Sequence, residues 1–213
     1  MDSRETTRQR RSYRMAQRAD GARARRDLIV RAAVALHGGR GVAGTSWAAI
    51  ADRAGVSTAT VYRHFPDLEA LVPACAQFAF EAGARLPTQE ELAQAFSGLP
   101  TAAKRLRRLI AESCACYERA EEWLAACRRD AHGVPALAQA VLTQERALED
   151  LIDAALGGAL EPTRKAAMRA LLDFPFWKSL VDAGVPRPDA PAVIAGLAQS
   201  VLGPNPEERH EKS

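Results

Sequence analysis

The chain has 213 residues, 47% of them hydrophobic and 26% charged, which is enough for one or two domains with a sizeable core. No apolar run approaches the ~18 residues that a membrane helix needs, and no apolar segment follows the arginine-rich N-terminus, so we expect a cytoplasmic protein without a membrane partner. Alanine, the best helix former, occurs 44 times, and the β-branched residues that favour strands are sparse. The composition therefore predicts an all-α fold.

Charge is distributed unevenly along the chain. Residues 1–66 contain 13 arginines and 5 acidic residues, whereas residues 67–213 contain 16 basic and 21 acidic residues. An N-terminal region with this excess of positive charge favours a polyanionic partner, usually nucleic acid. Residues 1–26 carry 9 of these arginines and few apolar residues, so we expect residues 1–21 to be a flexible basic arm.

A helix-turn-helix pattern follows within the predicted domain 22–66. Apolar residues at helical spacing predict a first helix over 27–36, which the glycines at 38, 39 and 41 end. Ser46 is the expected N-cap of a second helix over 47–54, and Gly55 supplies the turn. Ser57 caps a third helix over 58–65, with Val61 and Phe65 facing inward. This arrangement exposes the first half of the third helix.

Exposed side chains on the third helix are of the types that hydrogen-bond phosphates and base edges. Three helices that pack together without binding DNA would also fit the pattern, but the basic N-terminal region favours DNA binding. The predicted DNA-binding residues are Ser46, Ser57, Thr58, Ala59, Thr60, Tyr62, Arg63 and His64.

The stretch from 45 to 65 resembles the DNA-binding domain of the TetR family of bacterial transcriptional regulators. The ordered core I-A-x-x-A-G-V-S-x-x-T-V-Y-x-H-F occupies residues 50–65, and the resemblance covers roughly 22–72. The resemblance implies a homodimer, a recognition helix that lies in the major groove and a helical domain that binds a small effector. It also implies DNA contacts by Thr60, Tyr62 and His64. Three departures stand out: His37 replaces a frequent phenylalanine, Ala49 a frequent acid and Leu68 a frequent basic residue that anchors a phosphate.

The rest of the chain reads as successive helices in a bundle domain over 67–202, with a solvated tail at 203–213. We expect these helices over 67–83, 88–96, 101–131, 135–156, 162–183 (kinked at Pro175) and 190–202. The cysteines and histidines show no spacing suited to a metal, so neither a metal site nor another cofactor is predicted.

Two sets of large apolar residues in this domain have predicted roles, although core packing is an alternative for each member. Aromatic residues on the central helices predict an apolar effector pocket formed by Phe78, Phe96, Cys114, Tyr117 and Trp123. By the resemblance, the last long helices form the dimer interface, which would place Phe174, Phe176 and Trp177 there.

The sequence thus predicts a DNA-binding transcriptional regulator rather than an enzyme. The partners expected are double-stranded operator DNA, a largely apolar small-molecule effector and a second copy of the chain. Repression that the effector releases is the favoured mode. Two alternatives stay open: an effector-independent DNA-binding protein, which would lack a cavity between its central helices, and an all-α enzyme with a basic tail, which would cluster acids or histidines in a cleft.

Overall fold

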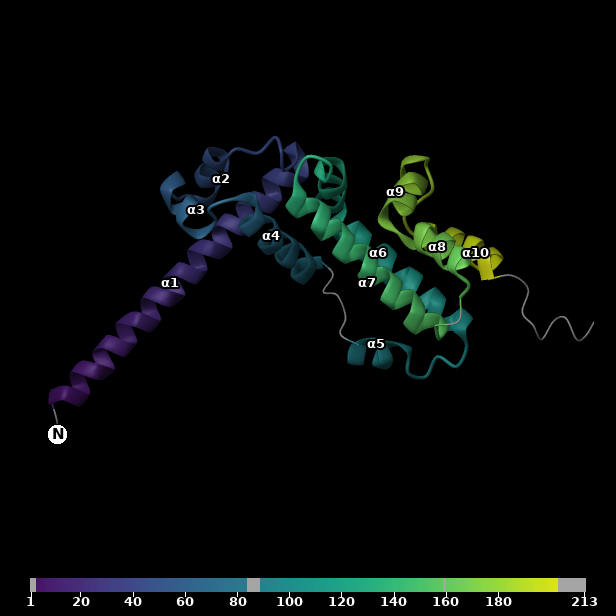
Figure 1. Cartoon of the computed structure of the whole chain (residues 1–213), viewed down its shortest axis with the longest axis horizontal. Coiled ribbons are helices and arrows are strands. Elements are labelled where there is room, and N and C mark those ends of the chain that lie inside the picture. The colour runs from purple at the N-terminus through teal and green to yellow at the C-terminus, as the bar shows by residue number, and fades with distance from the viewer. Residues whose placement is uncertain (1–2, 84–88, 159, 203–213) are drawn as a thin grey trace, which may run out of the picture.

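The computed structural model describes residues 3–83, 89–158 and 160–202, with side chains from Met15 onward except at 80–83, 89, 92 and 93. Within these ranges every regular element is a helix, in agreement with the predicted all-α fold (Figure 1). The helices are α1 (Ser3–Arg40), α2 (Trp47–Ala54), α3 (Thr58–His64), α4 (Leu68–Gly83), α5 (Gln89–Phe96), α6 (Ala102–Asp130), α7 (Pro135–Leu156), α8 (Pro162–Leu172), α9 (Phe174–Asp182) and α10 (Ala190–Leu202). The predicted tail at 203–213 lies outside the described residues. No described helix is both long and apolar enough to cross a bilayer.

Helix α1 is much longer than predicted, and residues 3–21 are helical rather than the flexible arm expected from the sequence. The arginine, glutamine and alanine residues of this segment are good helix formers, and lengthening an existing helix avoids the cost of a new nucleus. The helix also continues through Gly38 and Gly39 and ends at Arg40, where Gly41 follows with a φ of +80° in the left-handed region. Figure 1 shows the N-terminal part of α1 projecting away from the bundle.

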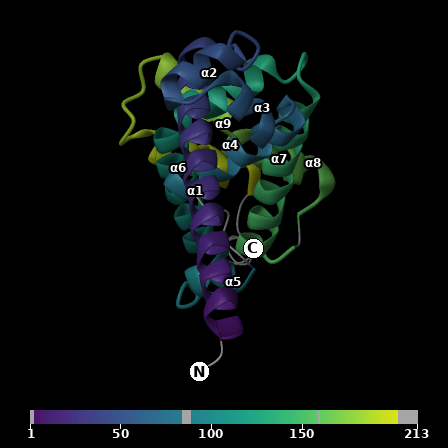
Figure 2. The same ribbon diagram turned by 90° about the vertical axis from the view of Figure 1, so that its left-hand side faces the viewer.

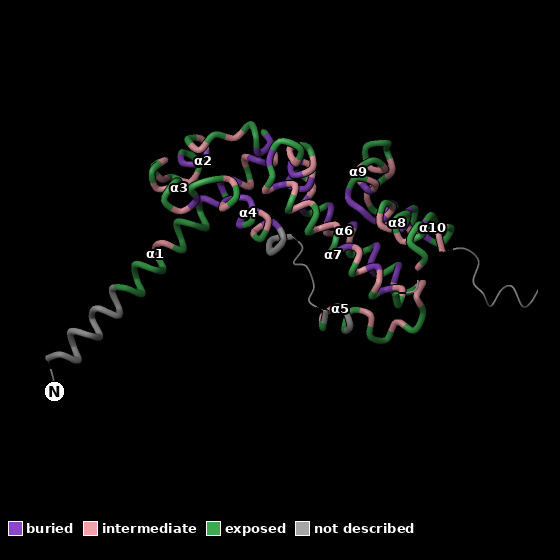
Figure 3. Tube along the Cα trace, in the orientation of Figure 1, coloured by how far each residue is buried: buried purple, intermediate pink, exposed green. Residues whose placement is uncertain are grey.

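The core of the C-terminal part lies between α6 and α7, which run side by side in Figure 1. The buried positions of α6 recur at helical spacing and include Leu106, Ile110 and Cys114. Figure 3 shows buried residues along both helices. Helix α4 packs against α1, α6 and α7, so it joins the N-terminal helices to the bundle.

The predicted helix over 162–183 is two helices, separated at Asp173 rather than kinked at Pro175. The Asp173 carboxylate accepts a hydrogen bond from the Phe174 backbone N–H at 2.8 Å and is the N-cap of α9. Pro175 then lies in the first turn of α9, where a missing N–H costs nothing. A salt bridge of 2.6 Å from Arg128 to Asp173 ties this break to α6.

Two of the three residues predicted for the dimer interface belong instead to the core of their own chain. Phe174 and Trp177 are 3% and 1% exposed, and both rings pack against Tyr117 of α6. Phe176 is half-buried and also packs on this core. The prediction is therefore wrong for Phe174 and Trp177, because an apolar run in sequence does not tell which neighbour covers it.

Candidate nucleic-acid interface

Helix α2 is held at both ends by its own local sequence. The Ser46 hydroxyl accepts a hydrogen bond from the Ala49 backbone N–H at 3.2 Å, so the cap forms although residue 49 is not an acid. Gly55 has a φ of +67°, which turns the chain out of α2 with little strain. Ile50 and Ala51 are buried beneath the turn. These features fix the direction in which α3 leaves.

Helix α3 is capped in the same way. Its N-cap Ser57 accepts from the Thr60 backbone N–H at 3.2 Å, and the hydroxyls of these two residues lie 2.9 Å apart. Val61 and Phe65 are buried, as predicted, which fixes the rotation of α3 about its axis. Arg63 donates to the Thr60 hydroxyl at 3.4 Å, so the two side chains share one side of the helix.

The eight predicted DNA-binding residues all lie on the surface of α2 and α3. Ser46, Ser57, Ala59, Tyr62 and Arg63 are exposed, and the other three, Thr58, Thr60 and His64, are half-buried. Ser46 and Ser57 also act as caps, which commits one acceptor of each hydroxyl to the protein. The exposed phenol and guanidinium of α3 are therefore the freest groups for an incoming ligand.

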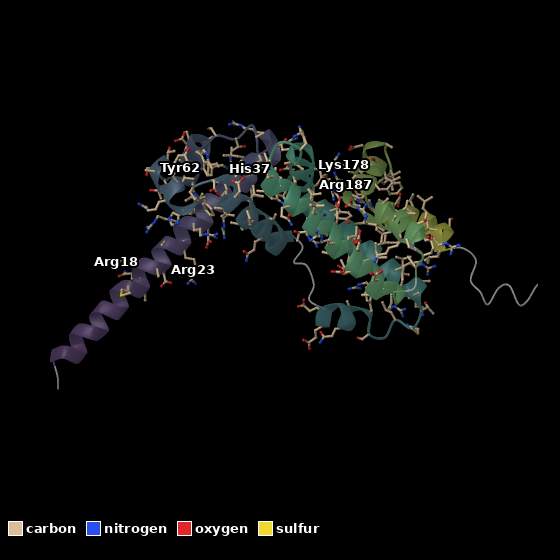
Figure 4. All side chains as sticks on the ribbon, in the orientation of Figure 1. Arg18, Arg23, His37, Tyr62, Lys178 and Arg187 are labelled. Atoms are coloured by element: carbon tan, nitrogen blue, oxygen red, sulfur yellow. The ribbon has the colours of Figure 1, made fainter. Side chains whose placement is uncertain are left out.

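Trp47 supports this surface and was not singled out from the sequence. Its ring lies 5.2 Å from that of Tyr62, centroid to centroid, at an angle of 36°. Trp47 is half-buried at the first position of α2, whereas Tyr62 is 47% exposed. Trp47 thus packs against one side of the Tyr62 ring, and Figure 4 shows Tyr62 near the end of α3.

Positive charge gathers where α1 passes the end of α3. The guanidinium of Arg26 lies 4.8 Å over the Phe65 ring. The pKa of His64 is below its usual value, first because of partial burial and then because of the charges of Arg63, Arg25 and Arg26. The α1 arginines are therefore close enough to α3 to act on it electrostatically. Figure 2, which faces this end of the molecule, shows α1, α2 and α3 in front of the bundle.

Leu68 stands where the resemblance to the TetR family leads us to expect a basic residue. Asp67 caps α4, because its carboxylate accepts from the Ala70 backbone N–H at 2.8 Å. Leu68 is half-buried and packs on the core. Neither side chain supplies a positive charge at the start of α4, so the basic groups of this face come from α1 and α3.

The five residues predicted for an effector pocket are not brought together. Phe78 and Trp123 line a hollow of about 370 Å³ between α1, α4 and α6. Tyr117 points elsewhere, since its hydroxyl donates to the Leu172 carbonyl at 2.7 Å, and Cys114 is buried in the core. Phe96 is half-buried on α5. The hollow is also lined by charged residues that were not expected from the sequence, namely Glu118, Arg119, Glu121 and Glu122.

The bundle touches the N-terminal domain at the end of α6. The Asp130 carboxylate accepts hydrogen bonds from the backbone N–H groups of Val42 at 2.6 Å and Ala43 at 3.2 Å. Gly41 allows this approach, because a Cβ there would lie 2.7 Å from the same carboxylate. One side chain of α6 thus holds the loop that leads into α2.

His37 is buried at this junction, in the last turn of α1. It is 0% exposed, its ring centroid lies 6.2 Å from that of Trp123, and neither ring nitrogen has a hydrogen-bond partner among the described residues. Burial lowers its pKa from 6.5 to about 4, although the nearby Gly41 backbone and the charge of Asp130 each act to raise the pKa. A group that resists protonation when folded makes the fold sensitive to acid.

We expect His37→Phe to flatten the pH dependence of stability between pH 6.5 and 4. In that window the unfolded wild-type chain binds a proton at His37 that the folded chain does not, so the free energy of unfolding falls as pH decreases, by about 3 kcal/mol in all. Urea denaturation at pH 7, 6 and 5 measures this slope in both proteins. Parallel slopes would show that His37 does not resist protonation in the folded state.

Comparison with known proteins agrees with this geometry. Residues 29–75 match the family model of bacterial regulatory proteins, tetR family. The likeness to the TetR family therefore lies in this N-terminal stretch of the chain. No curated protein matches its sequence significantly. The match spans the end of α1, the two helices of the motif and the start of α4, which are the elements that carry the surface described above.

Solved structures extend the likeness to the whole TetR-type fold. A protein from Rhodococcus sp. described as a TetR-family transcriptional regulator is 21% identical with a TM-score of 0.66, over 84% of this chain and 100% of its own. A TetR-family member from Streptomyces coelicolor A3 is 24% identical with a TM-score of 0.58, over 81% and 97%. The multidrug binding protein EbrR, solved with imidazole, is 24% identical with a TM-score of 0.56, over 81% and 94%. The chain thus shares its fold with these three proteins over most of its length.

Proposed function

We propose that this chain is a homodimeric repressor of the TetR family that binds a pseudo-palindromic operator through α3 and is released by a small effector. The observation that carries the proposal is the surface of α3. Tyr62 and Arg63 are exposed on a helix whose rotation is fixed by buried Val61 and Phe65, beside the arginines of α1. Phenol and guanidinium groups on a rigid, positively charged helix suit both phosphates and base edges.

The hollow between α1, α4 and α6 supports the effector part of the proposal. A volume of about 370 Å³ admits a small organic molecule, and Phe78 and Trp123 offer it aromatic surface. Glu118 and Glu122, which also line the hollow, favour an effector that carries a donor or a positive charge. Glu121 is already paired with Arg187 and Lys178. Because α1 and α6 both line the hollow, a ligand that fits one α1 position better than another would shift α3.

An exposed apolar face on α8 and α10 supports the homodimer. Val193 and Leu197 of α10 are 39% and 42% exposed, four residues apart on one side of the helix. Helix α8 contacts α10 and exposes Ala166, Ala167 and Ala170. Small and apolar side chains in adjacent helices suit close packing against the same face of a second copy. We propose this face in place of Phe174 and Trp177.

We expect Leu197→Asp to yield folded monomers at micromolar concentration. A two-fold interface contains the substituted position twice, so each dimer would bury two unpaired carboxylates. Sedimentation measures the mass and circular dichroism the helix content. Leu142→Asp is the matched control, since Leu142 is 45% exposed on α7, and it should leave the oligomeric state unchanged. A Leu197→Asp dimer of wild-type affinity would contradict the assignment of this face.

DNA binding itself is tested with a duplex recovered by selection from a random library. At one fixed salt concentration, Tyr62→Ala and Arg63→Ala should each weaken binding of this duplex by about 1–3 kcal/mol per half-site. Arg108→Ala is the control, because it removes the same charge from an exposed position of α6. If both α3 variants bind as tightly as the control, α3 does not contact the DNA.

A further inference from the structure

The exposed part of α1 has two chemically different sides. Residues 15–20 and 23–28 are exposed ahead of the helix-turn-helix. At about 100° per residue, Arg25 lies within about 20° of Arg18 around the helix axis. Asp20 and Asp27 lie on the opposite side, about 160–180° from Arg18, and Arg23 is about 140° away. Arg18 and Arg25 thus share one side of α1, whereas both acids and Arg23 lie on the other.

The sequence continues this pattern toward the N-terminus. Positions 4, 8, 11 and 14 are arginines, and their spacing places all four within about 80° of Arg18 around a continuous helix. We call Arg18 and Arg25, whose side chains the structure describes, the arginine stripe. No ion pair engages either of them within the described part of the chain, so their charges are available to a ligand.

The stripe begins beside α3 and leads away from it. Arg25 is near enough to lower the pKa of His64, and its neighbour Arg26 lies over Phe65. Arg18 is seven residues further out, about 10 Å along the helix. Figure 4 shows Arg18 and Arg23 on different sides of the α1 ribbon. The positive surface of α3 therefore continues along one side of α1.

We propose that the arginine stripe of α1 binds the phosphate backbone of duplex DNA that flanks the half-site contacted by α3. This inference rests on the proposed function. Arginine pairs with phosphate through two parallel hydrogen bonds, and the separation of Arg18 and Arg25 corresponds to about three base pairs. The acids on the far side disfavour any other approach of DNA to the helix. Among polyanions, DNA is favoured because the stripe is continuous with the surface of α3.

The test compares Arg18→Gln and Arg18→Gln/Arg25→Gln with Arg23→Gln, which removes one charge from the other side of the same helix. Glutamine keeps the helix propensity of arginine. Each full-length protein is titrated, over a range of salt concentrations, with the selected duplex carrying about 15 extra base pairs on each side and with the same duplex trimmed to its protected core.

On the long duplex, the log–log salt slope should fall by about 0.9 in Arg18→Gln and by about twice that in the double variant. Arg23→Gln should keep the wild-type slope, and on the trimmed duplex all four proteins should agree. An equal loss in Arg18→Gln and Arg23→Gln, an unchanged slope in the double variant, or a loss that persists on the trimmed duplex would each overturn the proposal.

Two outcomes separate this inference from the function on which it rests. If the wild-type protein recovers no duplex in the selection, the proposed function itself is wrong. The other outcome is that the wild-type protein binds the duplex and the double variant keeps the wild-type salt slope but no longer binds phosphatidylglycerol vesicles. The stripe would then contact a membrane surface, and only this inference would fail.

Discussion

Replacing Trp177 with alanine is expected to lower the free energy of unfolding by about 3–5 kcal/mol, the largest effect of any substitution considered for this chain. The Trp177 side chain is 1% exposed, and its ring centroid lies 6.0 Å from that of Tyr117 and 5.9 Å from that of Phe174. The Arg187 guanidinium covers the ring at 5.5 Å. Truncation would leave a cavity where α6 and α9 meet.

Urea denaturation at one protein concentration measures this loss, since the stability of a dimer depends on concentration. Trp47→Ala is the matched control: it removes the same side chain from a half-buried position, where part of the ring already contacts water. The loss of stability in Trp47→Ala should be clearly smaller than that in Trp177→Ala. A Trp177→Ala protein that dissociates without losing stability would instead restore this residue to the dimer interface.

The second large effect is expected for Asp130→Ala. This substitution should lower the free energy of unfolding by about 1–3 kcal/mol and also weaken DNA binding. The substitution leaves the backbone N–H groups of Val42 and Ala43 without their acceptor. Burial would raise the pKa of Asp130, but the hydrogen bonds from Ala43 and Val42 and the neighbouring Arg129 hold it below its usual value. This contribution to stability is therefore present above the usual aspartate pKa and is lost as the pH falls through the lowered one.

Two further variants separate the hydrogen bonds from the charge. Asp130→Asn keeps an acceptor oxygen and should lose less stability than Asp130→Ala. Glu112→Ala removes a carboxylate of α6 whose salt bridge with Arg108 is exposed, so its cost should be at most about 1 kcal/mol. Thermal denaturation and titration with the selected duplex measure both effects. An Asp130→Ala protein with wild-type DNA affinity would show that α6 does not position the helix-turn-helix.

The parts predicted well from the sequence are those that depend on neighbouring residues. Ser57 and Gly55 act on the backbone within a few positions, so the caps and turn around α3 followed from their order alone. The bounds of α7 and α10 agree with prediction because Pro135 opens α7, Gly157 closes it and the apolar pattern of α10 is regular.

The parts that were missed depend on contacts between distant segments. Trp47 meets Tyr62 from another helix, and Asp130 meets Val42 across 88 residues. The same holds for Trp177, whose apolar neighbours in sequence gave no sign that Tyr117 covers it. The helical state of residues 3–21 was missed because propensity alone does not tell whether a polar segment extends an adjacent helix.

Footprinting of the wild-type protein on the selected duplex tests most directly whether this chain binds DNA as a dimer through α3. We expect two symmetric protected half-sites, centred about 34 Å apart along the duplex, with two chains bound per DNA molecule. Sedimentation of the complex gives that ratio independently. A single protected half-site with one chain bound, or a duplex with no protected site at all, would contradict it.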